Sequence, residues 1–150
     1  MARPRRAGGP GDEHRTNGTF FSAPRRLEGV QLVHESEREP PKILASTVDT
    51  ADSIASQFRG LTFRRSLPDD YALAFRFGTA RTRDVHTMFV FVPLDVVWIV
   101  DDVVRRVERL RPWRGFARET ADLIVELPAG AATDVESGDR LVLEEDCTAG

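Results

Sequence analysis

One stretch of eighteen residues constrains the fold more than any other part of the chain. It reads VVWIVDDVVRRVERLRPW at residues 96–113, so that two runs rich in valine and isoleucine flank the dipeptide Asp101–Asp102. β-Branched residues favour strands, and a two-residue turn joins antiparallel strands in a tight hairpin. The stretch therefore predicts a β-hairpin, with Trp98 on its core side because the tryptophan alternates with valines.

Other short apolar runs surround this hairpin and are separated by prolines, glycines or charged residues. They predict strands at residues 30–36, 42–50, 71–77, 85–92, 122–128 and 140–145. Pro93 separates the run at 85–92 from the hairpin, because a proline cannot continue a central strand.

A single short helix is expected between the second and third of these runs. Asp49 or Thr50 can cap its start, Ile54 and Phe58 lie four residues apart on one face, and Gly60 can end it. Strands still dominate, and no alternation of strands with long helices is present. The sequence therefore predicts a mostly β fold, a small β-sandwich or barrel with one short helix.

The ends of the chain differ from its middle. Residues 1–29 are rich in arginine, glycine and proline and show no apolar period, so we expect a disordered basic arm. An alternative is that the biological start lies near Val30 and that this arm is mis-assigned. Residues 30–146 are expected to form a single β domain, and residues 147–150 a tail.

Charge and cysteine usage bear on partners and location. The net charge is −3, which argues against general affinity for nucleic acid. No apolar run is long enough for a membrane span or a secretion signal, so no membrane partner is expected. The one cysteine, Cys147, excludes an intramolecular disulfide. We therefore expect a cytoplasmic protein.

Five segments together resemble the domain of unknown function 192 family, also called uncharacterised protein family 0127. They are RGLTFRRSLPDD, YALAFRF, VPLDVVWIVDD, VELPAG and SGDRLVL, in the order and spacing of that family. The resemblance implies a small jelly-roll-like sandwich and assigns no biochemical activity. The arginine-rich, lysine-poor composition also suggests a haloarchaeal-type member.

This chain differs from the pattern of that family at one place. Many members of that family carry F-W-M-K-N-T before the proline, leucine and aspartate, whereas this chain has His86, Met88, Phe89 and Val90 at four of the matching positions. Asp95 is retained. If the lysine and asparagine of other members serve a polar ligand, that site is altered here.

Asp95 is the first candidate site residue, because it interrupts an apolar run. One hypothesis places it in a ligand pocket; the other, which we favour, makes it a structural aspartate that accepts backbone N–H bonds. A buried carboxylate needs a partner. Arginines of the segments at 64–65 and 81–83, or His86, are the candidate partners.

Three further residues complete the candidate set. His86 is the only histidine in the predicted central strands, although a place at a sheet edge is the simpler interpretation. Arg64 lies in an arginine- and phenylalanine-rich segment that could bind phosphate or bases, although ion pairing with nearby aspartates is favoured. Trp113, between Pro112 and Arg114, is expected to be half-exposed and to mark a contact surface.

No pattern for catalysis, metal binding or a cofactor was found. The carboxylate pairs lie at turns or a strand end, and no nucleophile is paired with a histidine. We therefore expect a non-catalytic module that binds a small ligand or a protein through Arg64, His86, Asp95 and Trp113. The alternative is a hydrolase- or isomerase-like enzyme using Asp95 with His86 or an arginine, and a third hypothesis is single-stranded nucleic-acid binding. Oligomeric state stays open.

Overall fold

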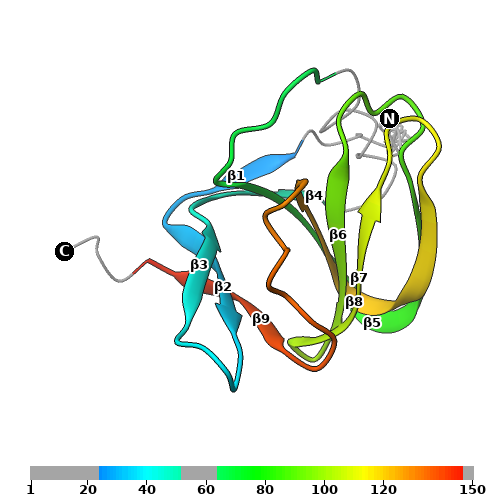
Figure 1. The fold of residues 1–150 in the computed structure, drawn as a ribbon. Coiled ribbons are helices and arrows are strands. Elements are labelled where there is room, and N and C mark those ends of the chain that lie inside the picture. Colours follow the sequence, from blue (N-terminus) through cyan, green and yellow to red (C-terminus); the bar gives the residue numbers. More distant parts are fainter. Residues whose placement is uncertain (1–23, 52–63, 147–150) are drawn as a thin grey trace, which may run out of the picture.

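The computed structural model describes residues 24–51 and 64–146, and these residues form nine strands in one curled sheet (Figure 1). The expected mostly β, sandwich- or barrel-like fold is confirmed, and the described residues contain no helix. The strands are β1 Arg25–Leu27, β2 Val30–Glu35, β3 Lys42–Ala45, β4 Thr47–Ala51, β5 Tyr71–His86, β6 Leu94–Val100, β7 Val103–Leu110, β8 Phe116–Pro128 and β9 Arg140–Glu145. Their order in the sheet is β1-β4-β5-β8-β6-β7-β9-β2-β3.

The predicted hairpin is confirmed as β6 and β7. The backbone φ angles of Asp101 and Asp102 are 51° and 65°, as expected for a type I′ turn, in which both central residues are left-handed. The strand pairing shifts by one residue between Trp98 and Ile99, so that Arg105 is the extra residue of a β-bulge.

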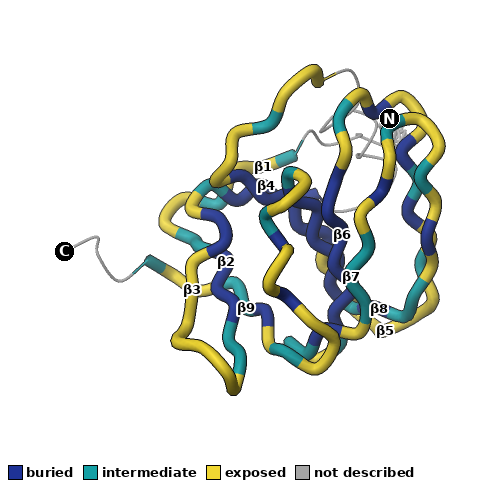
Figure 2. The backbone as a smooth tube through the Cα atoms, viewed as in Figure 1, coloured by how far each residue is buried: buried dark blue, intermediate teal, exposed yellow. Residues whose placement is uncertain are grey.

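Two hydrophobic cores lie on opposite faces of the same strands, because neighbouring residues of β6 and β8 alternate between them. Figure 2 shows in dark blue how much of these strands is buried. The inner core lies inside the curled sheet and takes side chains such as Leu32, Val97 and Leu123. The outer core is built around Trp98 and Ile124 and lies on the other face. Both cores consist of buried apolar side chains, and their burial is the main source of stability in a domain of this size.

The long strands β5 and β8 bend to enclose the outer core. They pair along two segments separated by an irregularity between Arg76 and Arg81. The first segment pairs Leu73 with Glu126, and the second ends with the pair His86 and Phe116. As a result the loops at 87–93 and 111–115 meet at the end of the sheet where β6 begins and β7 ends (Figure 1).

Two predicted strands and one predicted helix cap differ from what the structure shows. The run at 42–50 is broken at Ser46 into β3 and β4, because the N–H groups of Ser46 and Thr47 both donate to the carbonyl of Asp70. Asp49 and Thr50 lie inside β4 instead of capping a helix; the rest of the predicted helix lies outside the described residues. Only the first two residues of the run at 85–92 belong to a strand.

The predicted boundary at residue 30 is also too late. Arg25–Leu27 forms β1 and pairs antiparallel with β4, so part of the expected basic arm belongs to the sheet. The side chain of Arg26 holds it there through an ion pair with Asp49. Residues 1–23, 52–63 and 147–150 lie outside the described residues, and so do the predictions that concern them.

Candidate functional site

Thr87 ties two loops together at the end of the sheet where β6 begins. Its side chain is fully buried, and its hydroxyl donates to the carbonyl of Arg111 at 2.5 Å and accepts from the N–H of Gly115 at 2.8 Å. Its own carbonyl accepts the N–H groups of Val90 and Trp113 at 3.0 and 3.1 Å. One threonine therefore fixes the loop at 87–93 against the loop at 111–115.

Gly115 is what allows this close approach. A Cβ at this position would lie 2.7 Å from the Cβ of Leu110, 2.8 Å from the hydroxyl of Thr87 and 2.9 Å from the carbonyl of Arg111. Such distances are shorter than real Cβ contacts, and two of the three atoms belong to the Thr87 network. Only glycine fits at this position without moving the loops apart.

The two loops expose a cluster of aromatic side chains. Phe89 and Phe91 both pack edge-on against Trp113. Their ring centroids lie 5.5 and 5.1 Å, respectively, from the ring centroid of Trp113. The three side chains are 38–46% exposed, and the neighbouring Met88 and Phe116 are 52% and 60% exposed. We call these five residues the aromatic surface. Soluble domains seldom hold so many large apolar side chains together in water unless something binds there.

The backbone of this surface is strained. Four described residues other than glycine have positive φ, and two of them form the β6–β7 turn, where such angles are normal. The other two are Phe89 at 64° and Trp113 at 66°, the stacked aromatic residues themselves. An aromatic residue in this conformation costs roughly 1–2 kcal/mol. Strain of this kind is found where a structure holds a side chain in place for a function.

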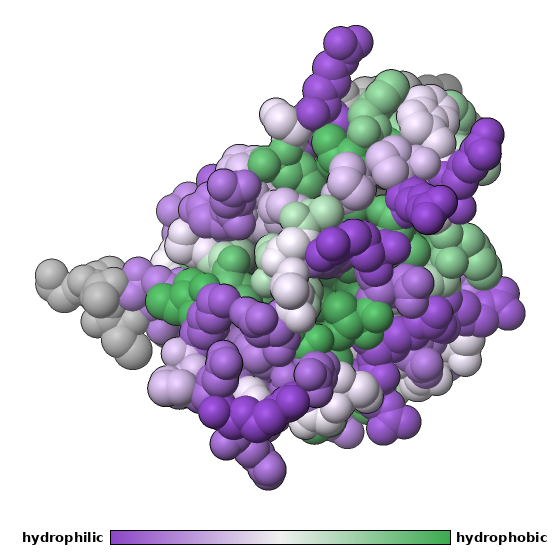
Figure 3. All heavy atoms as spheres, viewed as in Figure 1, coloured by the Kyte–Doolittle hydropathy of each residue, from purple (hydrophilic) through white to green (hydrophobic). Residues whose placement is uncertain are grey.

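The rest of the molecular surface has a different character. Hydrophilic side chains cover most of the lower part of the view, where β2, β3 and β9 lie (Figure 3). Among the large hydrophobic residues in the described ranges, Ile43 on β3 is the only strongly exposed one outside the aromatic surface. The aromatic surface is thus the main exposed apolar feature of the described chain.

Asp95 lies close to the end of the sheet where β6 begins, but its side chain is not accessible to solvent. Its carboxylate accepts hydrogen bonds from Nε of Arg109 at 2.8 Å and from the backbone N–H groups of Gly130 and Ala132 at 2.8 and 3.1 Å. The side chain of Asp95 is 3% exposed. This is the arrangement expected for a structural aspartate, and it secures the start of the loop that follows β8.

The partner of Asp95 was missed by sequence reasoning. It is neither His86 nor an arginine of the segments at 64–65 and 81–83, but Arg109 on the opposite strand of the hairpin. The ion pair raises the pKa of Arg109, first through the hydrogen bond and then through the charge of Asp95.

The other three predicted site residues lie at the same end of the sheet without converging on a pocket. His86 ends β5 opposite Phe116, and Trp113 belongs to the aromatic surface as a half-exposed residue, as predicted. The guanidinium of Arg64 lies 5.4 Å above the ring of Tyr71, the first residue of β5. None of the three described clefts is lined by any of the four predicted residues.

Tyr71 and Asp49 form a second polar contact beneath Arg64. The hydroxyl of Tyr71 donates to Asp49 at 3.1 Å, and Asp49 is also paired with Arg26. Burial raises the pKa of Tyr71 strongly, and the charge of Asp49 and its hydrogen bond add to this effect. A phenol held neutral in this way can donate a hydrogen bond but is a poor base.

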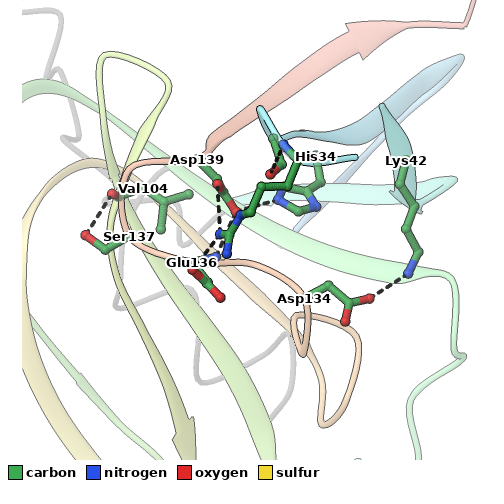
Figure 4. Close-up of polar contacts among 9 residues, drawn as sticks. His34, Lys42, Val104, Asp134, Glu136, Ser137 and Asp139 are labelled. Atoms are coloured by element: carbon green, nitrogen blue, oxygen red, sulfur yellow. Dashed lines mark hydrogen bonds and ion pairs between the residues drawn. The ribbon is translucent and has the colours of Figure 1, made fainter. Parts of the chain in front are cut away.

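A polar cluster that sequence reasoning missed surrounds His34 (Figure 4). His34 lies on β2, which β6, β7 and β9 separate from β8 in the sheet. His34 is buried, and its Nε2 lies 2.8 Å from the carboxylate of Asp139, which also accepts the N–H of Glu136. Arg38 lies over this pair and binds Glu136. Only the tertiary pairing of β2 with β9 brings these residues together, and no local motif indicates it.

The cations of this cluster are engaged in ion pairs. Two hollows of about 610 and 190 Å³ flank Arg38. Arg140, which lines the larger hollow, pairs with Glu35, and Asp134, which lines the smaller one, pairs with Lys42. Burial alone raises the pKa of Asp139, and the hydrogen bonds from His34 and Glu136 outweigh it and lower that pKa. This cluster holds the β2–β3 loop against the loop before β9.

No group of three or more histidine, cysteine, aspartate or glutamate side chains lies close enough to hold a metal ion within residues 24–51 and 64–146. In the same ranges, no helix is long and apolar enough to cross a bilayer.

Comparison with solved structures supports the fold. A Sinorhizobium meliloti 1021 protein, provisionally named a transcription regulator, superposes with a TM-score of 0.70 at 24% identity over 81% of this chain and 96% of its own. A protein of unknown function from Novosphingobium aromaticivorans DSM 12444 gives a TM-score of 0.67 at 17% identity over 81% of this chain and 93% of its own. At these identities the likeness concerns the fold alone. The search of curated proteins found no match.

The family is established by the sequence itself. The pattern of DUF192, described as an uncharacterized family, matches residues 35–143, which is more than half of the chain and runs from the end of β2 to β9. The matched range includes the hairpin, Asp95 and both loops of the aromatic surface. This chain therefore belongs to the DUF192 family.

Proposed function

We propose that this protein is a non-catalytic binding module and that its aromatic surface docks a partner protein. The observation that carries the proposal is the combination of exposure and fixation: Phe89 and Trp113 are 38% and 46% exposed in a strained conformation that hydrogen bonds of Thr87 help to fix. Side chains that are fixed before binding lose little conformational entropy on binding, which favours affinity. Tryptophan, phenylalanine, methionine and arginine are also the residues enriched at protein interfaces.

A protein partner fits this surface better than a small ligand does. Small-molecule sites are concave and enclose most of their ligand, whereas these side chains project from two loops. The described hollows lie beside Arg38 and near Leu143, away from the aromatic surface. A small ligand at Arg64, His86, Asp95 and Trp113 together has less support, because these side chains do not converge.

The geometry also favours binding over catalysis by Asp95 and His86. Asp95 directs its carboxylate to Arg109 and to two backbone amides, so it has little capacity left to act as a base. His86 lies on another strand, where its backbone pairs with Phe116. For single-stranded nucleic acid, the negative charge of the chain remains the main counter-argument.

Two finer expectations belong to the same proposal. A cytoplasmic location is supported by the single cysteine, Cys147. A haloarchaeal-type branch of the family, also known as uncharacterised protein family 0127, is supported by 20 arginines for one lysine among 21 basic residues. Neither expectation affects the choice of binding surface.

Site-specific photo-crosslinking in cells tests the proposal. A benzophenone amino acid at position 91 should give discrete protein adducts under light, and the adducts should survive nuclease treatment. The same amino acid at position 43, which is exposed to a similar extent on β3, is the matched control and should give none. Equal adduct patterns at both positions, or adducts that nuclease removes, would contradict docking of a protein at the aromatic surface.

A further inference from the structure

The charge around the aromatic surface differs in sign from the charge of the chain. Residues 87–93 and 111–116 contain two arginines, Arg111 and Arg114, and no acidic residue. Since the whole chain has a net charge of −3, the other residues sum to −5, because −5 and +2 give −3. The two loops are therefore a small positive region on a negative protein.

These two arginines are also available. Within the described residues, the guanidinium groups of Arg111 and Arg114 take part in no hydrogen bond or ion pair. Their neighbours differ: Arg109 is paired with Asp95, and Arg118 is paired with Asp84 at 2.6 Å. Arg111 and Arg114 lie on either side of Trp113 in the sequence, and neither is neutralised by an acidic side chain of the described residues.

We propose that the partner presents carboxylates directly beside large apolar side chains, that is, an acidic and apolar peptide segment. This inference rests on the proposed function and specifies the partner's chemistry. The apolar side chains pack against Phe89, Phe91 and Trp113, and the carboxylates pair with Arg111 and Arg114. A guanidinium binds a carboxylate through two parallel hydrogen bonds, so the pairing adds orientation as well as attraction.

Two other occupants fit less well. In a symmetric dimer of this chain the same surface faces itself, which brings the arginines of both copies together and costs free energy through like-charge repulsion. The two arginines attract the phosphates of a nucleic acid, but the net negative charge of the rest of the chain repels them. Phe89 and Phe91 stack edge-on against Trp113, with interplanar angles of 69° and 87°, so the rings do not form parallel platforms for successive bases.

A displayed library of random twelve-residue peptides tests the inference with the full-length chain. Three baits are compared: the natural sequence, Phe89→Asn/Trp113→Asn, and Arg111→Glu/Arg114→Glu. Asparagine tolerates positive φ, so the first variant removes the rings without adding backbone strain. We expect the natural chain to enrich peptides that combine aspartate or glutamate with aromatic or aliphatic residues.

The charge-reversal variant gives the decisive comparison. An enriched acidic peptide, labelled with fluorescein, should bind Arg111→Glu/Arg114→Glu at least about ten-fold more weakly by anisotropy, and its affinity should fall as salt is added. The matched control is Arg76→Glu/Arg105→Glu, which reverses two exposed arginines outside the two loops. This control should bind the peptide within about two-fold of the natural chain.

The outcomes separate the two proposals. If enriched peptides lack acidic residues but still require Phe89 and Trp113, the surface docks a partner and the acidic chemistry is wrong. If peptides bind the Phe89→Asn/Trp113→Asn bait as well as the natural chain, or if no peptide is enriched, docking at this surface is wrong as well. Binding of the natural chain to vesicles of anionic phospholipid, but not to peptides, would overturn both in favour of a membrane surface.

Discussion

Arg109 lies directly opposite Asp95 in the β6–β7 hairpin, and its Nε is 2.8 Å from the buried carboxylate. The carboxylate holds two amides of the loop that follows β8 at the same time. The pair therefore connects the hairpin, the loop and the inner core, in which Ala132 is packed.

Removing the two partners should have unequal and non-additive effects. Asp95→Ala leaves the buried N–H of Ala132 without an acceptor and should lower the free energy of unfolding by about 2–4 kcal/mol. Arg109→Ala should cost less, because its side chain is largely exposed. The double variant should cost no more than Asp95→Ala alone. Urea unfolding measures all three, and additive effects would show that the pair is not coupled.

The Thr87 network should control the order of the aromatic surface. Thr87→Val keeps the shape of the side chain but removes both hydroxyl hydrogen bonds, which should cost about 1–3 kcal/mol. Thr87→Ser keeps the hydroxyl and is the control. Acrylamide should quench Trp113 more readily in the valine variant, whereas Trp98 is buried in every variant. Identical quenching in the two variants would mean that other contacts hold the loops.

The aromatic surface should contribute to binding and not to stability. Phe89→Asn/Trp113→Asn relieves backbone strain at two positions, which offsets the loss of ring contacts worth about 1 kcal/mol each. We expect a melting temperature within a few degrees of the natural chain, together with loss of the crosslinks from position 91. A large fall in the melting temperature would assign these rings a structural role.

Tyr71 offers a direct spectroscopic test of its environment, because it is the only tyrosine in the chain. Its raised pKa means that the folded protein disfavours the phenolate. Absorbance at 295 nm should therefore stay flat through pH 10, where a free tyrosine is half-ionised, and should rise only on alkaline unfolding. The chain in urea is the control. A transition near pH 10 without unfolding would contradict the buried contact with Asp49.

The lowered pKa of Asp139 predicts a loss of stability in acid. A carboxyl whose pKa is lowered by folding contributes stability above its ordinary value of 3.8, and this contribution disappears as the pH falls through its folded pKa. The difference in unfolding free energy between the natural chain and Asp139→Asn should therefore be largest above pH 4 and should shrink below it. If the difference in unfolding free energy is the same at pH 3 and pH 6, protonation of Asp139 does not cause the loss of stability in acid.

The limits of the sequence can be seen in the β6–β7 hairpin. Its existence, its turn and the burial of Trp98 follow from local patterns, and all were predicted correctly. Counting from the turn, however, places Glu108 opposite Asp95, two acids together. The bulge at Arg105 moves the pairing by one residue and brings Arg109 into place. A bulge leaves no clear local pattern, so the partner of Asp95 could not be deduced.

The loops of the aromatic surface were misjudged for a related reason. The run at 85–92 has the composition of a buried strand, and nothing local separates it from one. What ends the strand at His86 is the set of hydrogen bonds from Thr87 to residues 24 and 28 positions away. The half-exposure of Trp113 was predicted correctly because it is flanked by proline and arginine, which is a local signal.

The course of β8 has a consequence for how this protein opens. Leu123 of this strand belongs to the inner core and Ile124 to the outer core, so one strand is a wall of both. Neither core can loosen while the other stays intact, and the two must melt in a single cooperative step. The amides at 123–125 should then exchange with solvent only when the entire molecule unfolds. Phe116 begins this same strand, so β8 connects the aromatic surface directly to the part of the protein that we expect to open last.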